Sequence, residues 1–269
     1  MPVLGGVLLD YQLIDGQGVG IPLAYAAYVF VVLIVAKIIL HFLNERKFMK
    51  RNDQLRLQFR FIQKQLDTHF TFNVLNSISA SILNNNRLEA HKQLTVFSKV
   101  LRYIFDDKIS LLHQLDKEIS LIENYLILED QRFKNKFDYD IHVDAHINRL
   151  TMVPKQIIQI FVDNAIRHGL MPLKSGGYLK INISHEGDDI FISIEDNGVG
   201  RAKAARTNTL EKKGYSIDIM YQAIDFLNSL QTDDKIDLQI FDLYKNGKAS
   251  GTRTEIRLPS GYDPKLDPS

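Results

Sequence analysis

An apolar stretch near the start of the chain limits what the first forty residues can form. From Gly16 to Ala36 no residue is charged, and further apolar residues follow Lys37. A helix of about 20 apolar residues spans the hydrocarbon layer of a bilayer. The sequence therefore predicts one transmembrane helix at residues 18–43, after a short extracytoplasmic N-terminus at residues 1–17.

The charges that flank this stretch predict its orientation. Asp10 and Asp15 precede it, whereas four basic residues follow it directly: Arg46, Lys47, Lys50 and Arg51. Positive residues are retained on the cytoplasmic side of a membrane. We therefore expect a single-pass protein of the cytoplasmic membrane, with its N-terminus outside and its large C-terminal part in the cytoplasm. A cleaved signal peptide is the alternative, but its basic n-region is missing.

The overall composition excludes several classes of function. In the 269 residues, 33 Lys and Arg balance 32 Asp and Glu, so no basic surface for direct nucleic-acid binding is expected. The chain has no cysteine, which excludes disulfides, thiolate nucleophiles and cysteine zinc sites. Neither observation limits chemistry that uses His, Asp, Asn or backbone amides.

The segment after the membrane stretch has helical periodicity. Residues 44–66 suit a signalling helix that enters a dimeric coiled coil, because apolar residues recur every three or four positions at Leu55, Phe59, Ile62 and Leu66. Residues 67–135 contain three further helical stretches. The first two flank Asn84–Asn86 and predict an antiparallel helical hairpin for dimerisation, and the third runs from Leu115 to Phe133.

Residues 136–260 combine strand and helix signals. One helix is expected from Pro154 to Leu170 and another ends near Leu230. Period-two alternation predicts strands near residues 139–143, 178–184, 190–195, 236–244 and 252–258. This mixture indicates an α+β fold, with helices on one face of a mostly antiparallel sheet. Residues 261–269 are expected to be a flexible tail.

The helix expected after Pro154 carries a first group of candidate site residues. Asn164 and His168 are four residues apart, on a different face from the apolar residues. The amide oxygen of Asn is a ligand that Mg²⁺ accepts while it bridges nucleotide phosphates, and His168 could donate to a phosphate. A polar helix edge without a ligand would give the same pattern.

A second group follows the strand near residue 195. Asp196-Asn197-Gly198-Val199-Gly200 places two glycines where a backbone could approach a ligand closely, beside a carboxylate that suits the amino group of adenine. An ordinary hairpin turn is the alternative. The segment 201–213 is rich in Lys and Arg, and Gly214 then opens a helix. A mobile lid over a polyphosphate and a solvated loop both fit this composition.

His69 is the candidate nucleophile in the helical region. The buried stripe of its helix is expected at Leu66, Phe70, Val74 and Ile78, which leaves His69 and Asn73 on a polar stripe beside it. An exposed neutral imidazole can attack a γ-phosphate, although most surface histidines are inert.

In combination, these residues resemble the LytS/AlgZ-like family of bacterial sensor histidine kinases. The family's phospho-acceptor motif corresponds to Thr68 to Asn76, and its asparagine box corresponds to Asp163 to Gly169, behind Pro154 and Gln159. Its D-N-G-x-G box corresponds to Asp196 to Gly200, and its last strand to Gly251 through Pro259. The resemblance implies a GHKL (Bergerat-type) α/β sandwich after the helical hairpin.

The resemblance also implies the chemistry. ATP with Mg²⁺ would phosphorylate His69 in a homodimer, and the phosphoryl group would pass to an aspartate of a cognate response regulator. Asp196 would recognise adenine, Asn164 would hold Mg²⁺, and Asp163 and Asn73 would assist catalysis. The remaining ATP-binding residues implied by the family motifs are Arg167, His168, Gly198, Gly200, Gly214 and Thr252.

Some positions depart from the family pattern. Thr68 replaces a proline, Asp163 replaces a glutamate, and Ser216 replaces the second glycine of the box that begins at Gly214. These changes keep a second hypothesis open: a membrane-anchored pseudokinase, acting as a dimeric interaction module that regulates a partner kinase.

Overall fold

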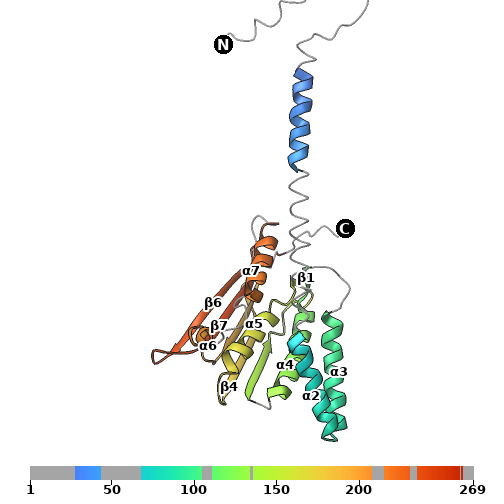
Figure 1. Ribbon diagram of the computed structural model, residues 1–269. Coiled ribbons are helices and arrows are strands. Elements are labelled where there is room, and N and C mark those ends of the chain that lie inside the picture. Colours follow the sequence, from blue (N-terminus) through green and yellow to red (C-terminus); the bar gives the residue numbers. More distant parts are fainter. Residues whose placement is uncertain are drawn as a thin grey trace, which may run out of the picture. The chain divides into compact units, whose positions relative to one another are not determined.

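The computed structural model describes residues 28–43, 68–104, 111–133, 136–207, 215–230, 235–260 and 262. The chain divides into two units, Met1–Asp53 and Gln54–Ser269. In the first unit, residues 28–43 form a helix (Figure 1). All side chains of this helix are exposed. Among the described residues, no helix has both the length and the hydrophobicity that crossing a membrane requires. The signalling helix expected at residues 44–66 lies outside the described residues.

The second unit begins with a helical hairpin. Helix α2 (Thr68–Leu83) and helix α3 (Arg87–Ile104) pack side by side, close to the ranges that the sequence predicts (Figure 1). The asparagine cluster makes the turn, because Asn85 has a positive φ of 58° and the Asn86 side chain accepts a hydrogen bond from the Glu89 amide at 3.2 Å. Asn tolerates the left-handed conformation seen at Asn85, and its side chain commonly caps a helix N-terminus, as that of Asn86 does.

Helix α4 (Leu115–Phe133) follows with the bounds that the sequence predicts. Two short strands beside it were not predicted: β1 (Leu112–Gln114) and β3 (Met152–Pro154), which pair antiparallel. Three residues are too few to show a period-two pattern. Pro154 therefore ends a strand, and the expectation that it opens a helix is wrong.

The larger sheet, within residues 136–260, has five strands in the order β2-β4-β5-β7-β6. β2 pairs with β4 in parallel and the other three pairings are antiparallel, which confirms the mixed, mostly antiparallel sheet. Alternate side chains of the central strands are buried, so one face of the sheet packs and the other meets solvent. The strands are β2 (Phe137–Val143), β4 (Gly177–Glu186), β5 (Asp189–Asp196), β6 (Asp237–Lys245) and β7 (Lys248–Leu258).

The helical elements of this part differ from the prediction in two places. The helix expected at 154–170 is a turn followed by α5 (Gln159–Asn164) and a π-helix, η1 (Ala165–Leu170). The first half of the expected basic loop is a helix, α6 (Arg201–Thr207), because its alanines are strong helix formers. Helix α7 (Tyr215–Asn228) follows, while Gly214 lies outside the described residues. Tyr262, from the expected tail, is buried.

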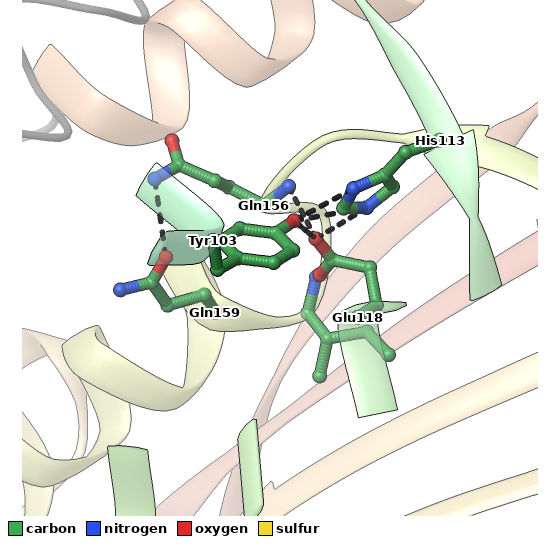
Figure 2. Close-up of polar contacts among 6 residues, drawn as sticks. Tyr103, His113, Glu118, Gln156 and Gln159 are labelled. Atoms are coloured by element: carbon green, nitrogen blue, oxygen red, sulfur yellow. Dashed lines mark hydrogen bonds and ion pairs between the residues drawn. The ribbon is translucent and has the colours of Figure 1, made fainter. Parts of the chain in front are cut away.

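A buried polar cluster joins the helical region to the start of α5 (Figure 2). The Glu118 carboxylate of α4 is fully buried and accepts a hydrogen bond from the Tyr103 hydroxyl of α3 at 2.8 Å. Its Oε1 also lies 2.8 Å from Nε2 of the buried His113 on β1. The backbone amides of Gln156 and Ile158 donate to the same carboxylate at 2.6 and 3.1 Å.

These bonds explain why the segment before α5 is a turn. Gln156 has a φ of 63°, a conformation that costs a non-glycine residue about 1 kcal/mol or more. The two amide bonds to Glu118 offset this cost, because hydrogen bonds to a charged acceptor are the strong ones. Glu118 thus sets where α5 begins.

Replacing Glu118 with Gln should lower the free energy of unfolding by about 3 kcal/mol, because a buried N–H would then face an amide donor instead of an acceptor. Glu123→Gln, on the exposed side of the same helix, should change stability by less than about 0.5 kcal/mol. Urea unfolding of the two variants, followed by circular dichroism, measures both values. Equal stability of the two variants would contradict a structural role for Glu118.

Candidate nucleotide-binding and phospho-acceptor site

The asparagine box spans the junction between α5 and η1. Asn164 ends α5 and His168 lies within η1, so the two residues do not share one regular α-helical face as expected. The wider π turn, closed by the Met171 amide on the Ile166 carbonyl at 2.8 Å, changes the angular spacing of the side chains. Single π turns occur often at functional sites.

Asn164 is oriented by its own helix. Its amide nitrogen donates to the Ile160 carbonyl at 2.6 Å, so its amide oxygen is the atom available to a ligand. Asn164 and His168 are both half-buried. An amide oxygen held in this way suits a hard cation such as Mg²⁺.

Asp163 lies in a cluster with Tyr125 of α4 and Arg167 of η1. The Tyr125 hydroxyl donates to Asp163 Oδ1 at 2.5 Å, and Arg167 Nε donates to the same oxygen at 2.6 Å. Burial raises the pKa of Tyr125 well above its usual range, and the Asp163 charge raises it further, so the phenol stays protonated as a donor. Both bonds use Oδ1, and the side chain is 24% exposed, so Oδ2 can meet a reacting group.

Asp196, at the end of β5, is almost fully buried. Its Oδ1 accepts a hydrogen bond from the Gly198 amide at 2.7 Å, and its Oδ2 accepts one from the Thr252 hydroxyl of β7. Burial raises the pKa of Asp196 above the usual range, although these hydrogen bonds oppose the shift. A carboxylate has about four acceptor positions, so two bonds leave capacity for a ligand donor.

Two glycines bring the two motifs into direct contact. A Cβ on Gly198 would overlap the backbone of Gly169, and a Cβ on Gly169 would lie 2.7 Å from Asp196 Oδ1. The Val199 amide donates to the Gly169 carbonyl at 3.0 Å. The asparagine box and the D-N-G-x-G box therefore form one site, although they are distant in the sequence.

The rest of the D-N-G-x-G loop is fixed by the strands around it. The Asn197 side chain accepts from the Tyr178 amide at 2.7 Å and donates to the Gly176 carbonyl at 2.9 Å. Gly200 has a φ of 76°, which favours glycine, and α6 begins at the next residue. Arg201 then forms two 2.8 Å hydrogen bonds with Asp242 of β6, which anchors the start of α6.

The candidate phospho-acceptor, His69, lies on α2. His69 is the second residue of this helix, and its side chain lies outside what the structure describes. Phe70 is buried, and its ring centroid is 5.2 Å from that of Tyr125. Asn73, one turn after His69, is half-buried. Tyr125 therefore lies between Phe70 and Asp163 and contacts both of them.

Two of these residues could not be assigned a role from the sequence alone. Gly169 closes the asparagine box, but its tight contact with Asp196 depends on the sheet register. Tyr125 lies in the expected helix at Leu115 to Phe133, where it resembles a residue of the family's linker helix, and that resemblance assigns it no role. A buried Tyr needs a partner for its hydroxyl, and this is the signal that could have pointed to a polar neighbour.

Comparison with known proteins agrees with this geometry. Residues 57–137 match the histidine kinase family model, and residues 151–261 match the model described as histidine kinase-, DNA gyrase B-, and HSP90-like ATPase. The first segment contains α2 to α4, and the second contains four of the five strands of the sheet, β4 to β7. Two separate parts of the chain are thus similar to histidine kinase models. The LytS-like resemblance drawn from the motifs is thereby confirmed.

Several curated bacterial proteins are similar over part of their length. The chain is 32% identical to the putative uncharacterized protein YwpD of Bacillus subtilis over 55% of this chain and 53% of that one. It is 32% identical to the sensor histidine kinase YpdA of Escherichia coli, over 56% and 27%. It is 33% identical to the sensor histidine kinase/phosphatase LytS of Staphylococcus aureus, over 54% and 25%. The matched region thus spans about half of YwpD and a quarter of the other two.

Solved structures are similar at a lower level. The histidine kinase AdeS of Acinetobacter baumannii aligns over 77% of this chain and 97% of that chain, with a TM-score of 0.37 and 14% identity. The mycobacterial sensor histidine kinase MprB aligns over 53% and 93%, with a TM-score of 0.38 and 15% identity. Because these scores are low, the similarity to histidine kinases rests on the sequence matches.

Gly198→Ala should lower nucleotide affinity by at least about tenfold and stability by about 2 kcal/mol or more, because the new methyl group overlaps the Gly169 backbone. Gly187→Ala is the matched control. Gly187 turns between β4 and β5 with a φ of 64° and open space around it, so this change should cost about 1 kcal/mol and leave affinity unchanged. Isothermal titration with ATP and thermal unfolding measure both effects. Equal affinity of the two variants would argue against the shared site.

Proposed function

We propose that this chain is a sensor histidine kinase that uses ATP to phosphorylate His69 and passes the phosphoryl group to an aspartate of a response regulator. The observation that carries the proposal is the contact between Gly169 and Gly198, which joins the asparagine box to the D-N-G-x-G box around the buried Asp196. The matches of residues 57–137 and 151–261 to histidine kinase models support the same activity.

The residues around Asp196 fit a purine nucleotide. Asp196 is a buried acceptor with capacity for the amino group of adenine, and Thr252 keeps it in place. Gly198 and Gly200 hold the loop beside Asp196 close to Gly169 and Ala249, because a Cβ on either glycine would meet one of these residues. Arg167, His168 and the amide-rich start of the helix after Gly214 would meet the phosphates.

The donor set fits a Mg²⁺ ion held mainly by its nucleotide. Within the described residues, no three His, Asp or Glu side chains come together in a way that could hold a metal. Asn164 would supply one amide oxygen, and phosphate oxygens and water would complete the octahedron that Mg²⁺ requires. The bound ion neutralises phosphate charge during transfer.

The transfer step needs a nucleophile, a proton acceptor and in-line geometry. A ring nitrogen of His69 attacks the γ-phosphorus, the N–P bond forms, and the bond to the β-phosphate oxygen breaks to release ADP. The hydrogen bonds from Tyr125 and Arg167 both end on Asp163 Oδ1. Oδ2 of Asp163 would take the proton that the imidazole loses. Asn73, one turn along α2, would orient the imidazole.

Exposed apolar side chains on the helical hairpin support a homodimer. Six large apolar residues of α2 and α3 are exposed: Phe72, Leu75, Ile82, Leu83, Leu88 and Leu94. An apolar surface of this kind on a helix pair marks a site of association. Two copies that pair through their hairpins would cover it, as the helices of a bundle do.

A membrane anchor at residues 18–43 would connect this kinase to its stimulus. The helix at residues 28–43 exposes apolar side chains along its whole length, which suits lipid better than water. The basic residues that follow it support a cytoplasmic kinase region and an outside N-terminus.

Incubating the full chain in lipid nanodiscs with Mg²⁺ and γ-labelled ATP should give protein-bound label that is lost in acid, because phosphohistidine is acid-labile. His69→Gln should abolish the label, whereas His91→Gln, which changes an exposed histidine of α3, should retain it. ATP binding without label in the wild-type chain would contradict the kinase and favour the pseudokinase that regulates a partner.

Nucleotide affinity should depend on the ionisation of Asp196. The carboxylate form accepts from adenine, so affinity is complete above the raised pKa of Asp196 and is lost as the pH falls through it. Asp196→Asn should weaken ATP binding about 10- to 100-fold, since a hydrogen bond to a charged group contributes about 1.5–3 kcal/mol. Titration calorimetry from pH 8 down to the lowest pH at which the chain stays folded tests this. If the Asp196→Asn variant lost as much ATP affinity at low pH as the wild type, the pH dependence would come from protonation of the nucleotide and not of Asp196.

A further inference from the structure

One side chain of α4, that of Tyr125, contacts both the acceptor helix α2 and the asparagine box. Tyr125 is 1% exposed, its ring lies 5.2 Å from that of Phe70, and its hydroxyl is 2.5 Å from Asp163 Oδ1. Phe70 follows His69 directly, and Asp163 precedes Asn164 directly. Of the two groups that would exchange a proton during transfer, Asp163 is therefore bonded directly to Tyr125, and His69 directly precedes the residue that packs on the Tyr125 ring.

The hydroxyl of Tyr125 has a geometric effect that Arg167 cannot replace. Arg167 is four residues after Asp163 on the same helical segment, so its bond moves with Asp163. Tyr125 belongs to α4, and its bond therefore fixes Asp163 relative to a separate element. The short O–H to carboxylate distance is that of a charge-assisted hydrogen bond, which is both strong and directional.

The Tyr125 ring also limits the position of α2. Phe70 packs against Tyr125 and Phe97 and is buried between α2, α3 and α4. A rotation or shift of α2 would move Phe70 against this ring. Because buried aromatic rings fill their space closely, the position of α2 beside Tyr125 is defined.

We propose that Tyr125 is a positioning residue for the phosphorylation of His69, setting the distance between the acceptor helix and Asp163. This inference rests on the proposed kinase function and on Asp163 as the proton acceptor. Tyr125 does not touch the nucleotide, so its effect should appear in the transfer step and not in ATP binding.

The test uses the full chain in nanodiscs and compares Tyr125→Phe, Asp163→Asn and the double variant. Tyr125→Phe keeps the ring and removes only the hydroxyl. Its rate of His69 phosphorylation at saturating ATP should fall at least about tenfold, while its dissociation constant for ATP stays within about twofold. The double variant should be no slower than Asp163→Asn, because the hydroxyl acts through that carboxylate.

Tyr139→Phe is the matched control, since Tyr139 is a half-buried tyrosine of β2 that packs on the core. It should keep the wild-type rate. A wild-type rate in Tyr125→Phe would overturn the inference and leave the kinase intact, and so would multiplicative losses in the double variant. Absence of label in the wild-type chain would overturn the kinase function and this inference together.

Discussion

The buried carboxylate of Glu118 is the interaction on which the rest of the site depends. It gathers a hydroxyl from α3, an imidazole from β1 and two backbone amides from the turn before α5. A buried charge is tolerated only when it is this fully paired. Since those amides fix where α5 begins, they also fix Asp163 and Asn164 at its end. Two turns further along α4, Tyr125 reaches Asp163 directly, so one helix positions both ends of α5.

The second constraint is steric. Gly169 and Gly198 approach so closely that neither position accepts a side chain without displacement. Their contact holds the π-helix against the loop after β5, and Asp196 is buried between them with Thr252. Polar groups from three sequence regions therefore share one site, and each region is anchored by its own strand or helix.

The sequence predicted the long elements and the motifs well because their signals are local. Helix α4 has the expected bounds, and the strands of the sheet have a period-two pattern. The sequence-based prediction failed where tertiary contacts decide the backbone conformation. Pro154 ends a strand because β1 pairs with β3, and Gln156 takes a positive φ because Glu118 binds its amide. The contacts of Tyr125 and Gly169 likewise depend on packing between distant segments, which no local pattern records.

In the proposed reaction, ATP bound at the nucleotide site phosphorylates one histidine, His69. Locating the phosphoryl group tests this claim most directly. The full chain would be incubated with ATP and Mg²⁺ at neutral pH, digested without acid, and sequenced by electron-transfer mass spectrometry. The account predicts phosphorylation on His69, within the peptide that contains Phe70 and Asn73. A phosphoryl group on any other residue, or an unmodified His69 in a chain that has bound ATP, would contradict it.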